Sequence, residues 1–257
     1  MTALAFLSLV VWGVLLFARG NFWRLGGDRL GGPAAPQGDA RAILAIVPAR
    51  NEADVLPRTL PALLTQETTG PFRVILVDDH SGDGTAARAR ALAAECGRAD
   101  RLTVIEAAPL PAGWTGKLWA MRCGLAHAEA TGDPAERLLF TDADIHYGPG
   151  TLARLAGEAD RRRAVLASVM VRLRADSAAE RWLVPPFVYF FRMLYPFAWV
   201  ADPARRTAAA AGGSMLIERA ALQSAGGLEA IRGALIDDVA MGGLMKRTGP
   251  VWLGMSA

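Results

Sequence analysis

Two carboxylates one residue apart close an apolar run near the middle of the chain. The run covers residues 138–141, and Asp142 and Asp144 follow it. A buried strand of a parallel sheet reads as such a run, and alternate residues of an extended segment point the same way. Asp142 and Asp144 can therefore reach one hard divalent cation together. An Asp-rich turn after a strand is the plainer alternative.

A second polar cluster follows the apolar run 43–47. It reads Pro48-Ala49-Arg50-Asn51-Glu52. A structural reading covers much of it, because Asn51 could cap the next helix and Glu52 is ordinary in a first helical turn.

Two adjacent acid pairs complete the series. Asp78 and Asp79 come directly after the apolar run 72–77, where neighbouring carboxylates repel each other unless they bind something. Asp237 and Asp238 open a helix pattern. A helix N-terminus stabilises a carboxylate, so capping and chemistry are both open readings of this second pair.

One lysine lies among these clusters. Lys117 follows a flexible turn and begins a helix pattern, where it could hold a phosphate or simply face solvent. The chain has no G-x-S-x-G, P-loop or H-E-x-x-H motif, which removes the commonest hydrolase, NTPase and metalloprotease readings. The acidic loop at Asp78 has the wrong charge for a dinucleotide pyrophosphate, which excludes an NAD-dependent dehydrogenase.

From residue 41 on, apolar runs alternate with helical patterns. The predicted strands are 43–47, 72–77, 102–105, 138–141, 165–171, 214–217 and 251–254. The predicted helices are 53–64, 85–96, 117–130, 152–162 and 237–246. This order predicts βαβ units and a mostly parallel sheet flanked by helices on both faces. Ligands of such sheets gather at the carboxyl ends of the strands, where the acidic clusters lie.

Size and composition point to one α/β domain near lipid. The chain has 257 residues, 52% of them hydrophobic, with a net charge of +3 and a mean hydropathy of +0.23. This balance suits an anionic membrane surface or a phosphate-bearing ligand, and it is too weak to predict nucleic-acid binding. Cys96 and Cys123 show no metal or redox spacing, so we expect reduced thiols.

Two segments are predicted to meet the membrane. Residues 2–18 are uncharged and mostly apolar, and arginines follow them, which favours an uncleaved anchor with the rest of the chain in the cytoplasm over a signal peptide. Residues 184–200 are rich in aromatics, and their three prolines argue against a clean transmembrane helix. We expect this stretch to lie at the headgroup level, with an internal aromatic cluster as the alternative. The predicted organisation is an anchor over 1–20, a linker over 21–40 and one domain over 41–257.

Taken in order, the clusters resemble the GT-A glycosyltransferases of family 2. That family shows a P-x-x-N-E strand end, a D-D-x-S-x-D-x-T loop, a G-K-x-x-A helix start, a D-x-D pair and an E-D-like pair before a helix. The matching segments here are Pro48–Glu52, Asp78–Thr85, Gly116–Ala120, Asp142–Asp144 and Asp237–Asp238. The N-terminal run, the GKLWAMRCGLAHA stretch and the aromatic segment resemble more narrowly the bacterial membrane members associated with hopanoid biosynthesis.

The resemblance implies a Rossmann-like GT-A fold and a role for each cluster. The nucleotide-sugar donor, expected to be UDP-linked, would be bound by the first two clusters, the lysine and the first D-x-D acid: Pro48, Glu52, Asp78, Asp79, Lys117 and Asp142. Asp144, with Asp142 beside it, would coordinate Mn²⁺ or Mg²⁺. Gly212, Gly213 and Ser214 would border the acceptor. Asp238, with Asp237 beside it, would supply the general base.

The implied protein is an inverting, metal-dependent glycosyltransferase of the bacterial inner membrane. Its cytoplasmic domain would pass a sugar to a lipid acceptor, of the hopanoid type if the narrower resemblance holds. A membrane-anchored scaffold that only binds nucleotide sugars is the alternative, although it would not need such an array of acids. Membrane members of the family often carry a Q-x-x-R-W motif and further hydrophobic helices. Neither is present in these 257 residues. We therefore expect either a fragment or a protein that lacks the acceptor-side gate formed by these features.

Overall fold

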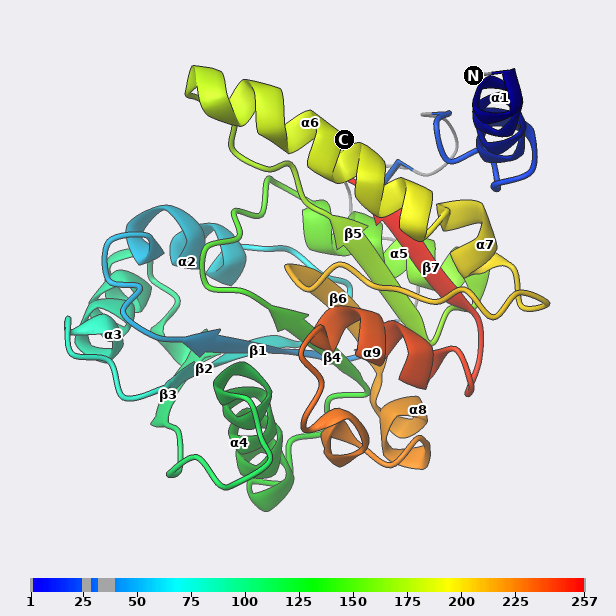
Figure 1. Ribbon diagram of the computed structural model, residues 1–257. Helices are drawn as coiled ribbons and strands as arrows, with labels where there is room; N and C mark the ends of the chain where they lie inside the picture. The colour runs from blue at the N-terminus through cyan, green and yellow to red at the C-terminus, as the bar shows by residue number, and fades with distance from the viewer. Residues whose placement is uncertain (1, 25–28, 32–39, 257) are drawn as a thin grey trace.

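A computed structural model describes residues 2–24, 29–31 and 40–256 of the chain. Within them, seven strands form one sheet in the order β3-β2-β1-β4-β6-β5-β7 (Figure 1). The strands are β1 (Ile43–Ala49), β2 (Phe72–Asp78), β3 (Leu102–Glu106), β4 (Arg137–Thr141), β5 (Leu166–Met170), β6 (Ser214–Glu218) and β7 (Val251–Met255). All the predicted strands are confirmed.

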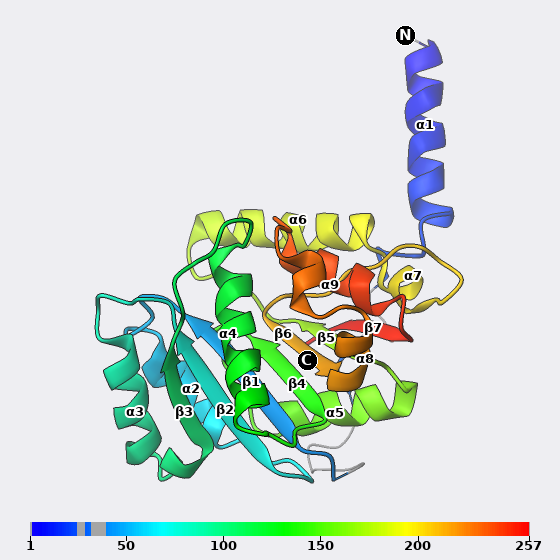
Figure 2. The same ribbon diagram turned by 90° about the horizontal axis from the view of Figure 1, so that it is seen from below.

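Nine helices lie in the described part of the chain, and all but α1 belong to the body that surrounds the sheet (Figure 2). They are α1 (Thr2–Phe17), α2 (Leu56–Leu64), α3 (Thr85–Glu95), α4 (Gly116–Ala130), α5 (Thr151–Arg162), α6 (Ala178–Leu194), α7 (Phe197–Ala201), α8 (Arg219–Ser224) and α9 (Asp237–Met245), with short 3₁₀ turns at Ala99–Arg101 and Leu228–Ile231. Residues of α4, α8 and α9 join one core cluster, and residues of α2, α3 and α5 join the other. Most of the predicted linker, 25–28 and 32–39, lies outside the described residues.

The sheet is parallel except at one strand. β6 runs antiparallel to both of its neighbours, β4 and β5. In the β4–β6 pair Thr141 lies opposite Ser214, so the start of β6 meets the carboxyl end of β4. The reversed strand thus brings residues 212–214 beside Asp142, at the edge where ligands of α/β sheets bind. The mixed, mostly parallel sheet predicted from the sequence is confirmed.

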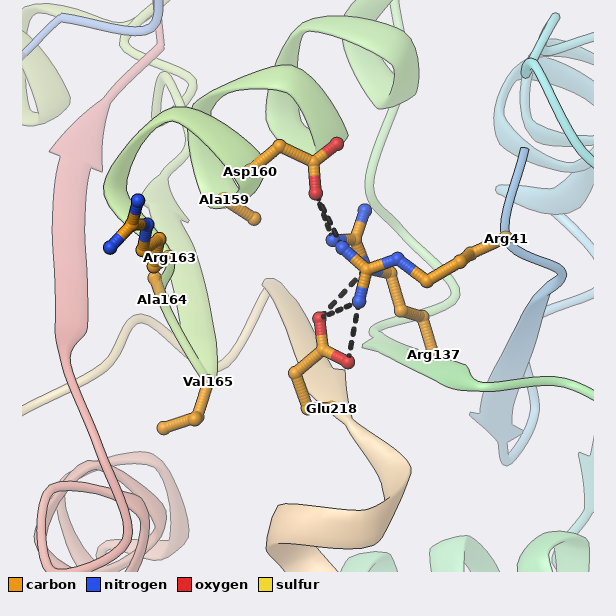
Figure 3. A pocket seen from close by; sticks show the side chains of 8 residues that line it. All are labelled: Arg41, Arg137, Ala159, Asp160, Arg163, Ala164, Val165 and Glu218. Atoms are coloured by element: carbon orange, nitrogen blue, oxygen red, sulfur yellow. Dashed lines mark hydrogen bonds and ion pairs between the residues drawn. The ribbon is translucent and has the colours of Figure 1, made fainter. Parts of the chain in front are cut away.

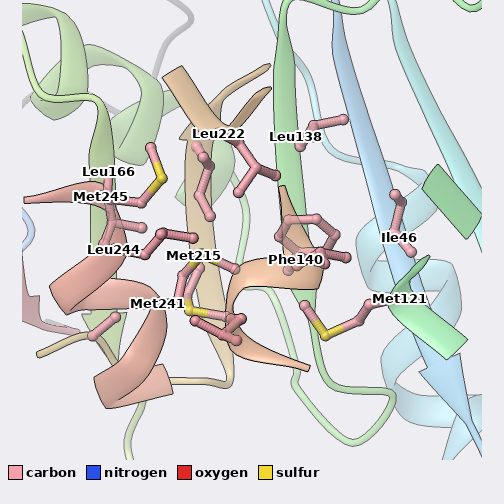
Figure 4. Packing of buried hydrophobic residues seen from close by; sticks show 14 of the residues in the cluster. Ile46, Met121, Leu138, Phe140, Leu166, Met215, Leu222, Met241, Leu244 and Met245 are labelled. Atoms are coloured by element: carbon pink, nitrogen blue, oxygen red, sulfur yellow. The ribbon is translucent and has the colours of Figure 1, made fainter. Parts of the chain in front are cut away.

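The larger core lies between the sheet and the α4–α9 face. Phe140 and Leu138 of β4, Met121 of α4 and Met241 of α9 contribute fully buried side chains to it (Figure 4). Unbranched methionines fill irregular gaps between helices, and here they pack where α9 meets the centre of the sheet. This packing fixes the position of the helix that begins with Asp237.

The prediction that Asn51 caps the following helix is wrong. The α2 helix begins only at Leu56, with Pro57 in its first turn, where a missing N–H does no harm. Asn51 adopts a left-handed conformation with φ of 56°. Its side-chain oxygen accepts a hydrogen bond from Gly82 N at 2.9 Å. The asparagine therefore joins two loops and is not available to the helix.

The aromatic segment is more helical than its prolines indicated. A capping box between Ser177 and Glu180 starts α6, which then continues through Pro185 and Pro186 and ends before Pro196. The carbonyls that lose a partner to the two internal prolines belong to exposed residues, so they can turn outward. In the described residues, Ala178–Ala201 is the stretch long and apolar enough to cross a membrane, by length and composition alone.

The predicted N-terminal helix is present as α1. It has no buried residue, and Figure 2 shows it rising away from the body of the molecule. Leu4 and Leu9 are 70% exposed and Phe17 is 84% exposed. The described part of the chain therefore buries none of the residues of α1, and its contact with the helix includes the hydrogen bond from Trp23 Nε1 to Leu16 O at 2.8 Å.

An ion-pair cluster closes the edge of the sheet opposite to the acidic residues (Figure 3). Arg137, at the start of β4, is only 2% exposed and bonds Glu218 of β6 at 2.9 Å and Asp160 of α5. Arg41, just before β1, pairs with the same two carboxylates. Arg137 and Glu218 lie directly opposite each other in the antiparallel ladder. The cluster therefore fixes the register of the reversed strand.

We predict that Arg137→Met lowers the free energy of unfolding by about 2 kcal/mol, because it removes a buried cation from two carboxylates. Arg88→Met is the control, since its exposed pair with Glu95 is worth less than about 0.5 kcal/mol. Urea unfolding of the detergent-solubilised chain, followed by circular dichroism, measures both. Equal losses for the two variants would contradict a structural role for the cluster.

Candidate active site

A cavity of about 410 Å³ opens at the carboxyl ends of β1 and β4. It is lined by Pro48, Ala49, Arg50, Glu52, Asp79, Gly116, Lys117, Ala120, Asp142, Ala143 and Asp144. The cavity lining thus holds four carboxylates, from one glutamate and three aspartates, and two cations, Arg50 and Lys117. Three separate loops and the start of α4 supply these groups, as expected for the edge where parallel strands end.

The second acidic loop is braced against the first. Ser81 Oγ accepts a hydrogen bond from Asn51 N at 2.9 Å, and Thr85 Oγ1 accepts one from Glu52 N at 2.9 Å. Asp78 Oδ1 accepts from Ser81 N at 3.0 Å. Asp78 is therefore engaged in shaping the loop and does not line the cavity.

Asp79, in contrast, faces the cavity. Its Oδ2 lies 3.3 Å from Arg50 Nη1, and a side chain at Gly116 would meet the same oxygen at 3.3 Å. The two adjacent acids, which the sequence suggested share one role, are thus divided. One orders the loop and the other is free to contact a ligand.

Lys117 connects the cavity to the acid pair of α9. Its Nζ lies 2.6 Å from Asp142 Oδ1 and 3.7 Å from Asp237 Oδ2. Burial disfavours the charged ammonium, but the contact with Asp142 outweighs it and raises the pKa of Lys117 above its usual value. Asp237 Oδ2 is buried and has no hydrogen-bond partner among the described residues. One lysine thus stands between acids from two distant parts of the chain.

Asp238 is held by two backbone amides. Its Oδ2 accepts from Gly212 N at 3.1 Å, and its Oδ1 accepts from Val239 N at 2.7 Å. Burial raises the pKa of Asp238, although these hydrogen bonds oppose the change. The α9 helix packs closely against the backbone at Ala209 because residue 242 is a glycine. A Cβ at Gly242 would lie 2.4 Å from the carbonyl carbon of Ala209.

The acids around Asp144 suit a cation. Asp144 is exposed at the cavity wall, and burial together with repulsion from Asp144 and Asp142 raises the pKa of Glu52. Within the described residues no three His, Cys, Asp or Glu side chains converge tightly enough to hold an ion alone. The protein therefore offers one or two carboxylates, and a bound anion would have to complete the coordination.

Gly212, Gly213 and Ser214 lie beside the acids but face different ways. A Cβ on Gly212 would lie 3.4 Å from Lys117 Nζ and 3.5 Å from Asp238 Oδ2. Thr141 Oγ1 donates to Gly213 O at 2.8 Å. Ser214 is buried and its hydroxyl bonds Tyr147 at 2.9 Å. Gly212 is thus the member of this trio that borders the acid pair.

The structure brings most of the predicted site residues together. Glu52, Asp79, Lys117, Asp142 and Asp144 share one cavity, and Lys117 joins them to Asp237 and Asp238. Sequence reasoning missed the role of Arg50 and the bracing loop contacts of Asn51. Asn51 stood inside the P-x-x-N-E motif, and its position two residues beyond a strand end was the available signal.

An α/β sheet with an acidic carboxyl edge and a reversed strand beside it defines a GT-A-like domain. The family model described as "Glycosyl transferase family 2" matches residues 44–224. This is more than half of the chain, so the chain belongs to that family of enzymes. A comparison with curated protein sequences finds no match.

Solved structures share the fold at low sequence identity. The mannosyltransferase PcManGT from Pyrobaculum calidifontis, in complex with GDP-Man and Mn²⁺, is 20% identical, with a TM-score of 0.62 over 96% of this chain and 66% of that one. S. aureus TarS is 18% identical, with a TM-score of 0.52 over 82% of this chain and 35% of that one. The chain thus spans somewhat less than two thirds of PcManGT.

We predict that Lys117→Met destabilises the fold by about 1 kcal/mol near neutral pH, since Asp142 and the α9 pair lose their shared cation. Losing the cation raises the folded-state pKa of Asp142 and Asp238 beyond the increase that burial already causes, so the deficit is full above this higher pKa and shrinks as pH falls through it. Lys117→Arg keeps the charge and should restore most of the stability. Thermal unfolding across pH measures this, and a deficit that does not change with pH would contradict it.

Proposed function

We propose that this chain is an inverting, metal-dependent glycosyltransferase that moves a sugar from a nucleotide-sugar donor to a lipid acceptor. One observation carries the proposal. Lys117 joins the acidic cavity at the strand ends to the helix-borne pair Asp237–Asp238, so a donor site and a base lie within a single cluster. A scaffold that only bound nucleotide sugars would have no need of the Asp237–Asp238 pair.

The cavity suits the nucleotide part of the donor. Pro48 and Asp79 lie on the wall at the ends of β1 and β2, where Asp79 can accept hydrogen bonds from a base or ribose. Lys117 supplies the positive charge for a phosphate. Asp78 does not line the cavity, and it orders the loop that carries Asp79 by accepting a hydrogen bond from Ser81 N. The donor nucleotide would be UDP by the resemblance, while PcManGT was solved with GDP-Man.

Asp144 is the proposed ligand of Mn²⁺ or Mg²⁺, with Asp142 beside it. Burial, and then repulsion from Asp144 and Asp142, raises the pKa of Glu52, and a divalent ion would offset the negative charge of these acids. When bound, such an ion stabilises charge on a departing diphosphate. PcManGT was solved with Mn²⁺. Asp142 also bonds Lys117, so it holds the lysine toward the same place.

Asp238 is the proposed general base. Two backbone amides fix its carboxylate, and Gly212, which has no side chain, adjoins it. The carboxylate takes the hydroxyl proton as the acceptor oxygen attacks the anomeric carbon from the face opposite to the leaving group. One base and no covalent nucleophile give inversion of configuration. Asp237 keeps the lysine near this base.

The lipid acceptor is proposed from the two apolar helices. α1 has no buried residue, and α6 exposes large aromatic side chains to solvent. An anchor in the bacterial inner membrane with the domain on its cytoplasmic side would place the site within reach of an amphiphilic hydroxyl compound. A hopanoid-type acceptor is the narrower form of this proposal and rests on the resemblance alone.

We predict that Asp238→Asn reduces sugar transfer by roughly 10²–10⁴-fold, the usual contribution of a general base, and leaves donor affinity unchanged. Turnover and nucleotide-sugar binding of the membrane-reconstituted chain measure the two effects. Asp100→Asn, at an exposed carboxylate on the opposite edge, is the matched control. Transfer at the normal rate by Asp238→Asn would remove this residue from the base role.

The pH profile gives a second test of Asp238. The base must be ionised, so transfer should be constant above its pKa and fall as pH decreases through it. Because burial raises this pKa above the ordinary 3.8, the fall should occur at a higher pH than for an exposed aspartate. A profile without an acid limb above pH 3.8 would contradict the assignment.

We predict that Asp144→Ala removes the dependence of turnover on added Mn²⁺ or Mg²⁺, along with most of the activity, because the variant lacks the proposed metal ligand. Titration of each metal against the initial rate measures it. Asp54→Ala, at an exposed acid near the same edge that does not line the cavity, is the control. Unchanged turnover and unchanged metal dependence in Asp144→Ala would overturn the site assignment.

A further inference from the structure

Large apolar side chains are exposed on three segments near the site. On α6, Trp182 is 81% and Phe187 is 57% exposed, and just before α9, Leu235 is 94% and Ile236 is 58% exposed. Large exposed apolar side chains that gather on one side of a molecule mark an interaction site. We call the whole set the docking face, and it consists of Leu110, Trp182, Leu183, Phe187, Phe190, Leu194, Leu235 and Ile236.

The three segments lie on one side of the molecule. In Figure 2, α6 lies across the top of the body, and both the loop before α4 and the segment leading into α9 reach the same level. Thr115 N donates to Arg232 O at 3.3 Å, so these last two segments touch. α1 rises upright from the same side (Figure 2).

Hydrogen bonds fix α1 relative to α6. Arg19, just after α1, donates to Met193 O at 3.0 Å and Leu194 O at 3.2 Å at the end of α6. Arg192 of α6 is buried and donates to Phe22 O at 2.9 Å and Arg24 O at 2.7 Å. If α1 enters a bilayer along its normal, this joint lays α6 along the bilayer surface.

The charges around the docking face favour anionic lipid. Arg24, Arg181, Arg206 and Arg232 are exposed and form no ion pair with a carboxylate of the described residues. Trp199, just beyond α6, lies between the guanidinium groups of Arg19 and Arg205, 5.1 Å and 4.9 Å from its ring. Arginine and tryptophan together are typical of the headgroup level. A second copy of the chain would bring an identical set of arginines, which disfavours self-association here.

We propose that the docking face binds the surface of an anionic bilayer, with Leu235 and Ile236 inserted at the boundary between headgroups and acyl chains. Asp237 is the next residue along the chain, so insertion holds the acid pair of α9 at the membrane surface. An acceptor hydroxyl at headgroup depth would then reach Asp238 without the lipid leaving the bilayer. This inference rests on the proposed function for its acceptor, and it adds residues to which sequence reasoning gave no role.

The test measures the depth of residue 236 directly. The full chain with Cys96→Ser, Cys123→Ser and Ile236→Cys is labelled with an environment-sensitive fluorophore and reconstituted into vesicles of phosphatidylcholine and phosphatidylglycerol. Ala94→Cys on α3, exposed and distant from the docking face, is the matched control. We expect a blue shift, and loss of emission to a quencher carried on the acyl chains, at position 236 and not at 94. Equal access of a water-soluble quencher to both positions would overturn the proposal.

Deuterium exchange of the unsubstituted chain gives a second readout. Peptides covering residues 232–236 should be protected in anionic vesicles and unprotected in detergent-free nanodiscs of phosphatidylcholine alone. Protection in both, with a doubled mass, would assign the face to a second copy and contradict the proposal. Insertion without sugar transfer would refute the proposed function only, and transfer with residue 236 in water would refute this inference only.

Discussion

The pairing of β6 with β4 is the constraint on which the site depends. The β6 strand alone runs against its neighbours, and this reversal places Gly212 and Gly213 beside the end of β4. The Arg137–Glu218 pair fixes one end of the ladder, and the Thr141–Gly213 hydrogen bond fixes the other. A slip of one residue would turn every side chain of β6 to the opposite face. Asp142 at the end of β4 and Asp237 at the start of α9 would then no longer share Lys117.

Charge balance explains the arrangement around that lysine. Lys117 contacts Asp142 and lies near Asp237, while Glu52, Asp79 and Asp144 add further negative charge to the same cavity. Like charges at this spacing destabilise a fold unless a ligand or ion offsets them. Such clustering of acids in a cavity is common where a protein binds a charged ligand.

The sequence predicted the strands well, and it predicted that the acids after them lie at one edge of the sheet, for a physical reason. Buried parallel strands require apolar runs, and the residues just after such runs must lie at one edge. The roles within pairs were harder to predict. Asp78 and Asp79 are alike in sequence, and only the backbone of the loop separates the structural acid from the one that faces the cavity. Asn51 was assigned to a helix that begins at Leu56, because its partner Gly82 is distant in the chain.

The two apolar segments show the same limit. Composition identified the apolar helix α1, but Pro185 and Pro186 argued against the continuous helix that α6 forms, since exposed carbonyls tolerate the lost hydrogen bonds. Leu235 and Ile236 gave no signal in sequence, because two apolar residues before a helix are ordinary. Their exposure on the same side of the molecule as α6 follows from the positions of the loop before α4 and the start of α9 in space.

The most direct test of the nucleotide-sugar site is thermal protection by nucleotides. The detergent-solubilised chain is heated with UDP, GDP or NAD, each with and without Mn²⁺. We predict that UDP or GDP raises the melting temperature only when Mn²⁺ is present, because the acidic wall then gains a shared cation, and that NAD has no effect. Protection by NAD, or no protection by either nucleoside diphosphate with Mn²⁺, would contradict the account.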